Sequence, residues 1–300
     1  MTSAGRFAPS PSGELHVGNL RTAMLAWLFA RSTDRRFLLR VDDLDRVRPG
    51  AEAEQLRDLA AVGVTWDGAV VHQTDRGPLY AEATERLTAA GLTYECFCTR
   101  REIQEAPSAP HAPQGAYPGT CRNLSAAERG AKREVRPAAV RLRAEITEAT
   151  VQDVLHGSYT GVVDDFVIRR NDGVTAYNLA VVVDDAAQGI DQVVRGDDLL
   201  PSTPRQAYLA SLLSMPVPEY VHAPLVLNAD GVRLAKRDGA VTLADLAIAG
   251  VPAAEVRDLL LASLGLPAGT MERALTVFDA AALPRGPWVW PGAGRHNARN

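Results

Sequence analysis

The 300-residue sequence has little cysteine and no long apolar run, and each shortage excludes a class of protein. Three cysteines, an odd and small number, exclude a disulfide-stabilised scaffold. No apolar stretch approaches the roughly 18 residues that a membrane span needs. The longest, at 20–30, is interrupted by Arg21 and ended by Arg31. The N-terminal Met-Thr-Ser-Ala-Gly lacks the pattern of a secretory signal, so we expect a cytoplasmic protein without membrane contact.

The sequence also lacks an excess of basic charge. Lys plus Arg number 32 and Asp plus Glu 36, a net charge of −4 that excludes a uniformly basic nucleic-acid coat. One segment departs from this balance: 122–143 holds seven basic and two acidic residues, a net +5 that leaves −9 for the remainder. Its basic residues are Arg122, Arg129, Lys132, Arg133, Arg136, Arg141 and Arg143. Such a segment predicts either a surface that follows a nucleic-acid backbone or an ordinary solvated helix face.

Strand and helix patterns alternate at the start of the chain, within a globular composition of 46% apolar and 23% charged residues. Strand patterns at 5–8 and 37–41 alternate with helix patterns at 20–32, 51–62 and 79–90. This order predicts an α/β fold with a doubly wound parallel sheet.

The alternation stops at the proline-rich segment 96–137, which we interpret as an inserted subdomain. Beyond it we expect strands at 139–142, 166–169, 177–183, 193–195 and 221–227, and helices at 204–213, 243–249, 253–264 and 271–281. The predicted organisation is a nucleotide-binding domain in two halves at 1–95 and 138–240, the insertion at 96–137, a helical region at 241–288 and a tail at 289–300. We find no internal repeat.

The loop after the first strand has the composition of a phosphate site. In a parallel sheet, ligands bind beyond the carboxyl ends of the strands, where a helix N-terminus presents unpaired N–H groups. Gly18 would let the backbone approach a phosphate, and His16 could donate a hydrogen bond to it. The alternative is a proline-rich turn with a surface histidine.

A second candidate for phosphate binding lies far along the chain, in Arg233-Leu234-Ala235-Lys236-Arg237. A lysine in a loop flanked by Gly231 and Gly239 could neutralise charge on transferring phosphate oxygens. Taken alone, Lys236 is better explained as a solvated surface lysine.

Together these segments resemble the class I aminoacyl-tRNA synthetases. His16-Val17-Gly18-Asn19 is similar to their HIGH motif, and 233–237 to their KMSKS motif. Arg6 to Gly13 and Arg40-Val41-Asp42-Asp43-Leu44-Asp45 are similar to the glutamate-specific branch. The cysteine segment, the strings at 176–185 and 194–199, and the short chain after the lysine loop narrow the resemblance to the glutamyl-Q tRNA(Asp) synthetase family.

The resemblance implies activation of glutamate by ATP and transfer of the glutamyl group to queuosine in the anticodon of tRNA(Asp). It implies Mg²⁺ with the ATP, His16 and Lys236 as catalytic residues, and a monomer. His16, Gly18, Asn19 and Lys236 would bind ATP. Glutamate would be bound by Arg6, Phe7, Ala8, Pro9, Ser10, Asp42, Tyr177 and Arg195.

Three positions depart from the family pattern. Asp42 stands where the family usually has Glu, one methylene longer, and Ala235 replaces a serine of the lysine loop. Asn19 replaces the last letter of the HIGH pattern. Lys236 remains, so we expect a functional site.

The three cysteines, Cys96, Cys98 and Cys121, are thiolate candidates for a structural zinc ion, or else three reduced thiols. The resemblance implies zinc, with Tyr117 as the fourth ligand; His111 is a chemically better rival nearby.

Two other functions remain open: a truncated glutamyl-tRNA synthetase charging a tRNA 3′ end, and a non-catalytic tRNA-binding paralogue. A small-molecule nucleotidyltransferase is disfavoured by the glutamate-binding strings.

Overall fold

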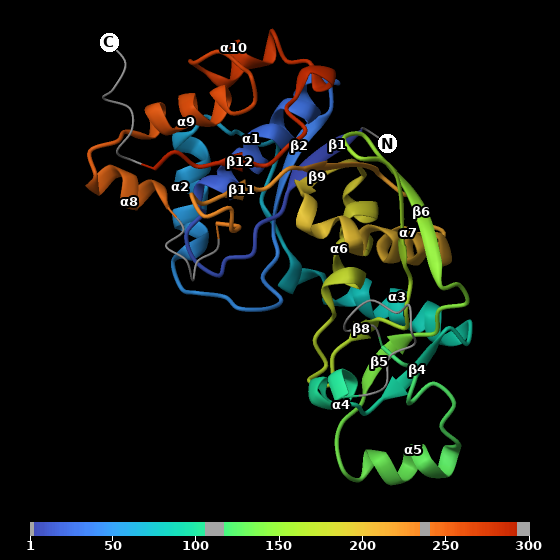
Figure 1. Cartoon of the computed structure of the whole chain (residues 1–300). Helices are drawn as coiled ribbons and strands as arrows, with labels where there is room; N and C mark the ends of the chain where they lie inside the picture. Colours follow the sequence, from blue (N-terminus) through green and yellow to red (C-terminus); the bar gives the residue numbers. More distant parts are fainter. Residues whose placement is uncertain (1–2, 106–116, 235–240, 293–300) are drawn as a thin grey trace.

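A seven-stranded sheet forms the centre of the computed structural model, which describes residues 3–105, 117–234 and 241–292 (Figure 1). The strand order is β3-β2-β1-β9-β10-β6-β7. Neighbouring strands are parallel except in the β6–β7 hairpin, which closes one edge. The strands are β1 (Ala4–Phe7), β2 (Arg36–Val41), β3 (Val71–His72), β6 (Glu148–Asp153), β7 (Gly157–Val162), β9 (Ile190–Gly196) and β10 (Glu219–Ala223).

The order of the strands reverses at β1. Gly5 of β1 pairs with Phe37 of β2 on one side and with Gln192 of β9 on the other. A Cβ atom at Gly5 would lie 2.9 Å from that of Ala30, so glycine lets the first helix pack against β1. The carboxyl end of β1 is therefore the point at which a doubly wound sheet places its ligand.

Helices cover the sheet and define two hydrophobic cores. The first core lies among α1, α2 and the C-terminal helices. The second lies among α3, α6, α7 and a separate three-stranded sheet. These helices are α1 (Val17–Ser32), α2 (Ala51–Ala61), α3 (Gly77–Ala89), α6 (Tyr177–Gln188), α7 (Thr203–Leu212), α8 (Leu243–Ile248), α9 (Ala253–Ala262) and α10 (Met271–Leu275).

Helix α1 is buried on nearly every side because it lies between the sheet and the C-terminal helices (Figure 1). Arg21, which interrupts its apolar run, is buried as well. Its guanidinium donates to the carbonyl oxygen of Pro224 (3.0 Å) and to Oγ of Ser263 (2.9 Å). This arginine thus joins α1 to the end of α9.

A three-stranded antiparallel sheet carries the insertion, at the opposite end of the molecule from α8–α10 (Figure 1). It takes β4 (Thr93–Cys96) from the start of the insertion and β5 (Ala139–Leu142) and β8 (Val167–Arg169) from after it. Two short helices, α4 (Arg100–Glu105) and α5 (Ala126–Arg133), accompany it.

The predicted α/β fold with a largely parallel sheet is confirmed, but the strand predicted at 177–183 is wrong. Those residues begin α6, which Gly189 closes in the left-handed conformation (φ 69°). The run Leu179 to Val183 is apolar throughout because this stretch of α6 is buried on all sides. A short continuous apolar run does not distinguish a buried strand from a buried helix.

The chain near residue 289 also differs from the prediction. Trp288–Val289 forms β12, which pairs in parallel with β11 (Val226–Leu227), and Trp290 is buried. These residues are therefore not part of a frayed tail. Helix α10 ends at Leu275, earlier than predicted, and β6 and β7 were not predicted. Within the described ranges, no helix combines the length and apolarity of a membrane span.

Candidate active site and thiol cluster

One pocket of about 460 Å³ lies at the carboxyl end of β1, where the strand order reverses. The pocket is lined by every residue that was predicted to bind ATP or glutamate and that lies in the described ranges. They are Arg6, Phe7, Ala8, Pro9, Ser10, His16, Gly18, Asn19, Asp42, Tyr177 and Arg195. Lys236 lies outside the described residues, as does His111.

His16 caps the N-terminus of α1 through its own ring. Nδ1 accepts the backbone N–H groups of Gly18 (3.1 Å) and Asn19 (3.3 Å), while the Asn19 side chain accepts the His16 N–H. The prediction of unpaired N–H groups at this helix start is therefore wrong. Because Nδ1 accepts, the neutral ring carries its proton on Nε2, where it can donate to a phosphate oxygen.

The structure gives a packing reason for glycine at position 18, in addition to the predicted one. A Cβ atom there would lie 3.0 Å from the His16 ring and 3.4 Å from Cβ of Val226. Glycine thus makes room for the capping imidazole, while its approach to a phosphate stays a prediction.

Both flanks of the lysine loop lie beside α1. On one side, Leu234 lines the pocket, and Arg233 pairs with Asp198 (Nη1 to Oδ2, 2.6 Å). On the other side, Val241 accepts the N–H of Val17 (3.0 Å), and Thr242 bridges His16. The chain therefore enters the segment 235–240 at the pocket and leaves it next to the capping histidine.

Gln55 of α2, which the sequence analysis missed, fixes the loop after β1. Its side-chain nitrogen donates to the carbonyl oxygens of Ser10 (3.0 Å) and Gly13 (2.6 Å), and the residue is buried. Only a contact across 45 positions reveals this role, so no local pattern could have indicated it.

Two buried arginines from neighbouring strands line the part of the pocket that is predicted to bind glutamate. Arg6 of β1 directs Nε and Nη2 at the carboxylate of Asp185 (3.3 and 3.4 Å). Arg195 of β9 donates to His222 (3.0 Å) and Thr203 (2.8 Å). Tyr177 begins α6 and is 44% exposed, so it is a pocket residue and no core filler.

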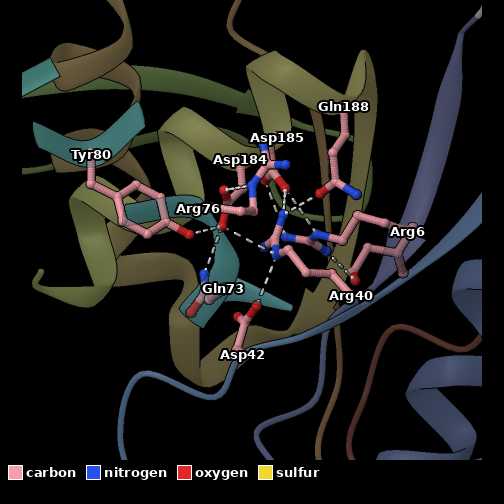
Figure 2. A network of polar contacts seen from close by, with 10 residues as sticks. Arg6, Arg40, Asp42, Gln73, Arg76, Tyr80, Asp184, Asp185 and Gln188 are labelled. Atoms are coloured by element: carbon pink, nitrogen blue, oxygen red, sulfur yellow. Dashed lines mark hydrogen bonds and ion pairs between the residues drawn. The ribbon is translucent and has the colours of Figure 1, made fainter. Parts of the chain in front are cut away.

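Arg6 and Asp42 belong to one buried network with Arg40 at its centre (Figure 2). Arg40 of β2 is fully buried and contacts Asp42 (2.8 Å) and Asp185 (2.7 Å), with Asp184 at 3.6 Å. Residues Gln73, Arg76 and Tyr80 hold Asp184 from the far side. Three arginines thus balance three aspartates inside the protein.

Asp42, the predicted partner of an ammonium group, already accepts a hydrogen bond from Arg40. Burial raises the pKa of Asp42, although Arg40 opposes that effect. Burial also acts on Asp185, but Arg6 and Arg40 outweigh it and lower the pKa of that carboxyl. Arg40 therefore acts on both the position and the charge of the carboxylate that is predicted to bind the ammonium group.

The three cysteines form a cluster in the insertion, with all sulfur atoms within 4.8 Å of one another. Oη of Tyr117 lies 3.3 Å from Sγ of Cys96 and 3.6 Å from Sγ of Cys98, and it accepts the N–H of Cys121 (2.8 Å). Tetrahedral zinc with Zn–S bonds of about 2.3 Å separates its sulfur ligands by roughly 3.8 Å. The donor set therefore fits one zinc ion, with Tyr117 at the fourth position.

The surroundings of the cluster act in opposite directions on two of its thiols. Burial raises the pKa of Cys98 to about 11. At Cys96 burial is outweighed by hydrogen bonds with Tyr117 and Arg141, which lower the pKa of that thiol. The Arg141 guanidinium also stacks 3.7 Å from the centre of the Tyr117 ring.

The chain matches the family model of the catalytic domain of class I tRNA synthetases (E and Q) over residues 4–275. It is 67% identical over 287 residues to the glutamyl-Q tRNA(Asp) synthetase of Nocardia farcinica, covering 95% of this chain and 92% of that one. It is 45% identical to the one from Symbiobacterium thermophilum, covering 94% of each. The chain belongs to the glutamyl-Q tRNA(Asp) synthetase family.

A solved structure agrees with this family. The glutamate tRNA ligase of Elizabethkingia meningosepticum, in complex with its amino acid, superposes with a TM-score of 0.80 at 25% identity. The match covers 96% of this chain and 66% of that one. As a member of a tRNA synthetase family the protein is a ligase, and the family implies an amino acid, ATP and a tRNA as its partners.

The basic segment 122–143 offers less unpaired positive charge for binding tRNA than its composition indicates. Arg133 pairs with Glu95 (2.7 Å) and Arg136 with Glu102 (3.2 Å). Arg129 and Lys132 of α5 take part in no salt bridge within the described residues. The positive charge that has no acidic partner among the described residues is thus concentrated on α5.

Proposed function

We propose that the protein activates glutamate with ATP and transfers it to queuosine in the anticodon of tRNA(Asp). The observation that carries the proposal is the pocket at the point where the strand order reverses. It joins the capping His16, the two buried arginines and the flank of the lysine loop. The names of the relatives supply the queuosine acceptor.

The first step is attack of the glutamate α-carboxylate on the α-phosphate of ATP, which releases pyrophosphate. Two anions must meet, so the site must supply positioned hydrogen-bond donors and positive charge. The Nε2 proton of His16 serves the phosphates from the start of α1. Lys236, from the segment between Leu234 and Val241, is proposed to serve the same phosphates, and Mg²⁺ accompanies the nucleotide.

Glutamate binds at the other end of the pocket in this proposal. Arg195 binds a carboxylate through the part of its guanidinium that His222 and Thr203 leave available. Asp42 receives the ammonium group, and Tyr177 borders the site from α6. Arg6 contributes positive charge to this end of the pocket, although its guanidinium already pairs with the carboxylate of Asp185.

Zinc at Cys96, Cys98, Tyr117 and Cys121 is proposed as a structural ion. The sulfurs hold together β4 and the turn at 119–124, in a segment whose own core is a handful of residues. A metal can supply folding energy where a core is too small to do so.

The experiment uses labelled glutamate, ATP and three forms of tRNA(Asp): with queuosine, without it, and with queuosine but lacking the 3′-terminal adenosine. After digestion to nucleosides, label on queuosine from the first and third forms supports the proposal. Label that requires the 3′ adenosine instead identifies a glutamyl-tRNA synthetase, the function of the structural relative.

Glutamate-dependent exchange between ATP and pyrophosphate tests the first step alone. Its absence in the wild type would identify a non-catalytic tRNA-binding protein. A Lys236→Ala variant that folds normally is expected to lose this exchange, and unchanged exchange would remove Lys236 from the mechanism.

A further inference from the structure

Arg195 is held by residues from the next two strands of the sheet. Arg195 of β9 pairs directly with His222 of β10, so the two side chains lie on the same face of the sheet. Asp153 ends β6, the strand on the far side of β10. Three neighbouring parallel strands thus contribute an arginine, a histidine and an aspartate near their carboxyl ends.

Both carboxylate oxygens of Asp153 accept hydrogen bonds from the surrounding protein. Asp153 Oδ1 accepts the N–H groups of Leu155 and His156, both at 2.9 Å. Its Oδ2 accepts the backbone N–H of His222 (3.0 Å) and lies 2.6 Å from Nδ1 of the same residue. Burial opposes its ionisation, but these hydrogen bonds prevail and lower the pKa of Asp153. The carboxylate is an immobile anion.

The anion fixes the tautomer of the fully buried His222. Since the carboxylate only accepts, Nδ1 must carry the proton. Nε2 lies 3.0 Å from Nε of Arg195, and a guanidinium only donates, so Nε2 must be the acceptor. Burial lowers the pKa of His222, which keeps the ring neutral, as this pair of bonds requires.

The histidine in turn determines which edge of Arg195 meets the pocket. Nε is bound to His222, Nη2 donates to Thr203 (2.8 Å), and the ring of Tyr220 lies 5.5 Å from the guanidinium carbon. The hydrogen bonds of Arg195 to described residues use no other atom, so Nη1 remains for a ligand. A guanidinium oriented in advance binds a carboxylate without losing further freedom.

We propose that Asp153 and His222 are positioning residues that hold Arg195 for the carboxylate of the amino-acid substrate. This inference rests on the proposed function, because it assigns a task to an arginine of that site. Neither residue touches the substrate; both act through Arg195.

The test compares two substitutions of the same histidine. In His222→Asn, the amide nitrogen can replace Nδ1 and keep the bond to Asp153, but the acceptor for Arg195 is lost. In His222→Gln, the amide oxygen reaches the place of Nε2, so that acceptor is restored. His72→Asn, at a half-buried histidine on β3 that pairs with Glu52, is the matched control.

The readout is the KM for glutamate and the KM for ATP in the exchange assay, with thermal unfolding to establish that each variant folds. We expect His222→Asn to raise the glutamate KM about tenfold to a hundredfold while the ATP KM stays within about twofold, with partial recovery in His222→Gln. A merely structural histidine would change both constants together. Equal changes, or an unchanged glutamate KM, would overturn the proposal.

A second measurement needs no variant and no activity. Nitrogen-15 NMR of histidine-labelled wild-type protein reports the tautomer of each ring. A neutral His222 protonated on Nδ1 is expected, whereas an imidazolium or a proton on Nε2 overturns the proposal. If the wild type activates a different amino acid, the glutamate proposal fails, and the same KM comparison is made with that amino acid, which also carries a carboxylate.

Discussion

Replacing Arg40 by methionine tests whether the buried ion network stabilises the fold. Methionine has a similar length and keeps the packing, but it removes the hydrogen bonds to Asp42, Asp185 and Gln188. The network then holds two arginines against three aspartates. Its net charge falls from zero to −1, inside a site where Arg40 and Asp184 are completely buried.

The magnitude follows from that burial. Breaking a buried ion pair by removing one partner costs about 3–5 kcal/mol, because the remaining charge is left uncompensated. For a chain of 300 residues the unfolding entropy at the midpoint is about 0.6 kcal/mol/K. The expected decrease in Tm is therefore about 5–8 °C.

The pH dependence has a definite sign. Burial already raises the pKa of Asp42, and loss of Arg40 raises it further. The cost of holding this carboxylate ionised is present above its raised pKa and is relieved as the pH falls through it. The stability difference between variant and wild type should therefore be smaller at pH 5.5 than at pH 8.

Calorimetry or circular dichroism at both pH values measures these effects. Arg133→Met is the matched control, because Arg133 lies exposed on α5 and its pair with Glu95 is solvent-screened. Its Tm should equal that of the wild type. A Tm for Arg40→Met within 2 °C of wild type, or a difference that grows toward low pH, would refute the reasoning.

Three further predictions concern the pocket and the insertion. Gly18→Ala places a Cβ atom 3.0 Å from the His16 ring, so the ATP KM in the exchange assay should rise about tenfold with the glutamate KM unchanged; an unaltered ATP KM would mean that the ring position is unimportant. Elemental analysis should find one zinc ion per wild-type chain and a large loss in Cys121→Ser, and zinc retained by that variant would exclude this thiol as a ligand. Reversing charge at Arg129 and Lys132 should weaken transfer to tRNA severalfold and leave pyrophosphate exchange intact, since neither forms a salt bridge with any residue that the structure describes; a parallel decline of both steps would indicate damage to the fold.

The sequence predicts best where one local pattern decides the structure. Helix α1 and the strand before it follow from apolar spacing, although the helix begins at Val17, three residues before the predicted start, because His16 caps it. The members of the pocket were predicted because the family resemblance covers strings on several elements at once. Zinc and the role of Lys236 stay predictions.

The failures arise where the environment, rather than the local pattern, determines the structure. The run 177–183 satisfies the composition of a strand, yet it folds as α6 because it is enclosed from all sides. His222 and Arg40 are missed because their roles depend on partners across strands, at separations of 69 and 145 positions. The basic segment is overestimated because Glu95 and Glu102 neutralise part of it from outside its range.

The position of β1 between β2 and β9 has a consequence during protein synthesis. One neighbour of β1 is made some thirty residues later, but the other only at Ile190–Gly196. At about 5–20 residues per second, the ribosome adds β9 roughly 10–40 s after β1. Throughout that interval one edge of β1 has no partner strand, and the binding pocket cannot assemble, although the loop that lines it was among the first segments translated.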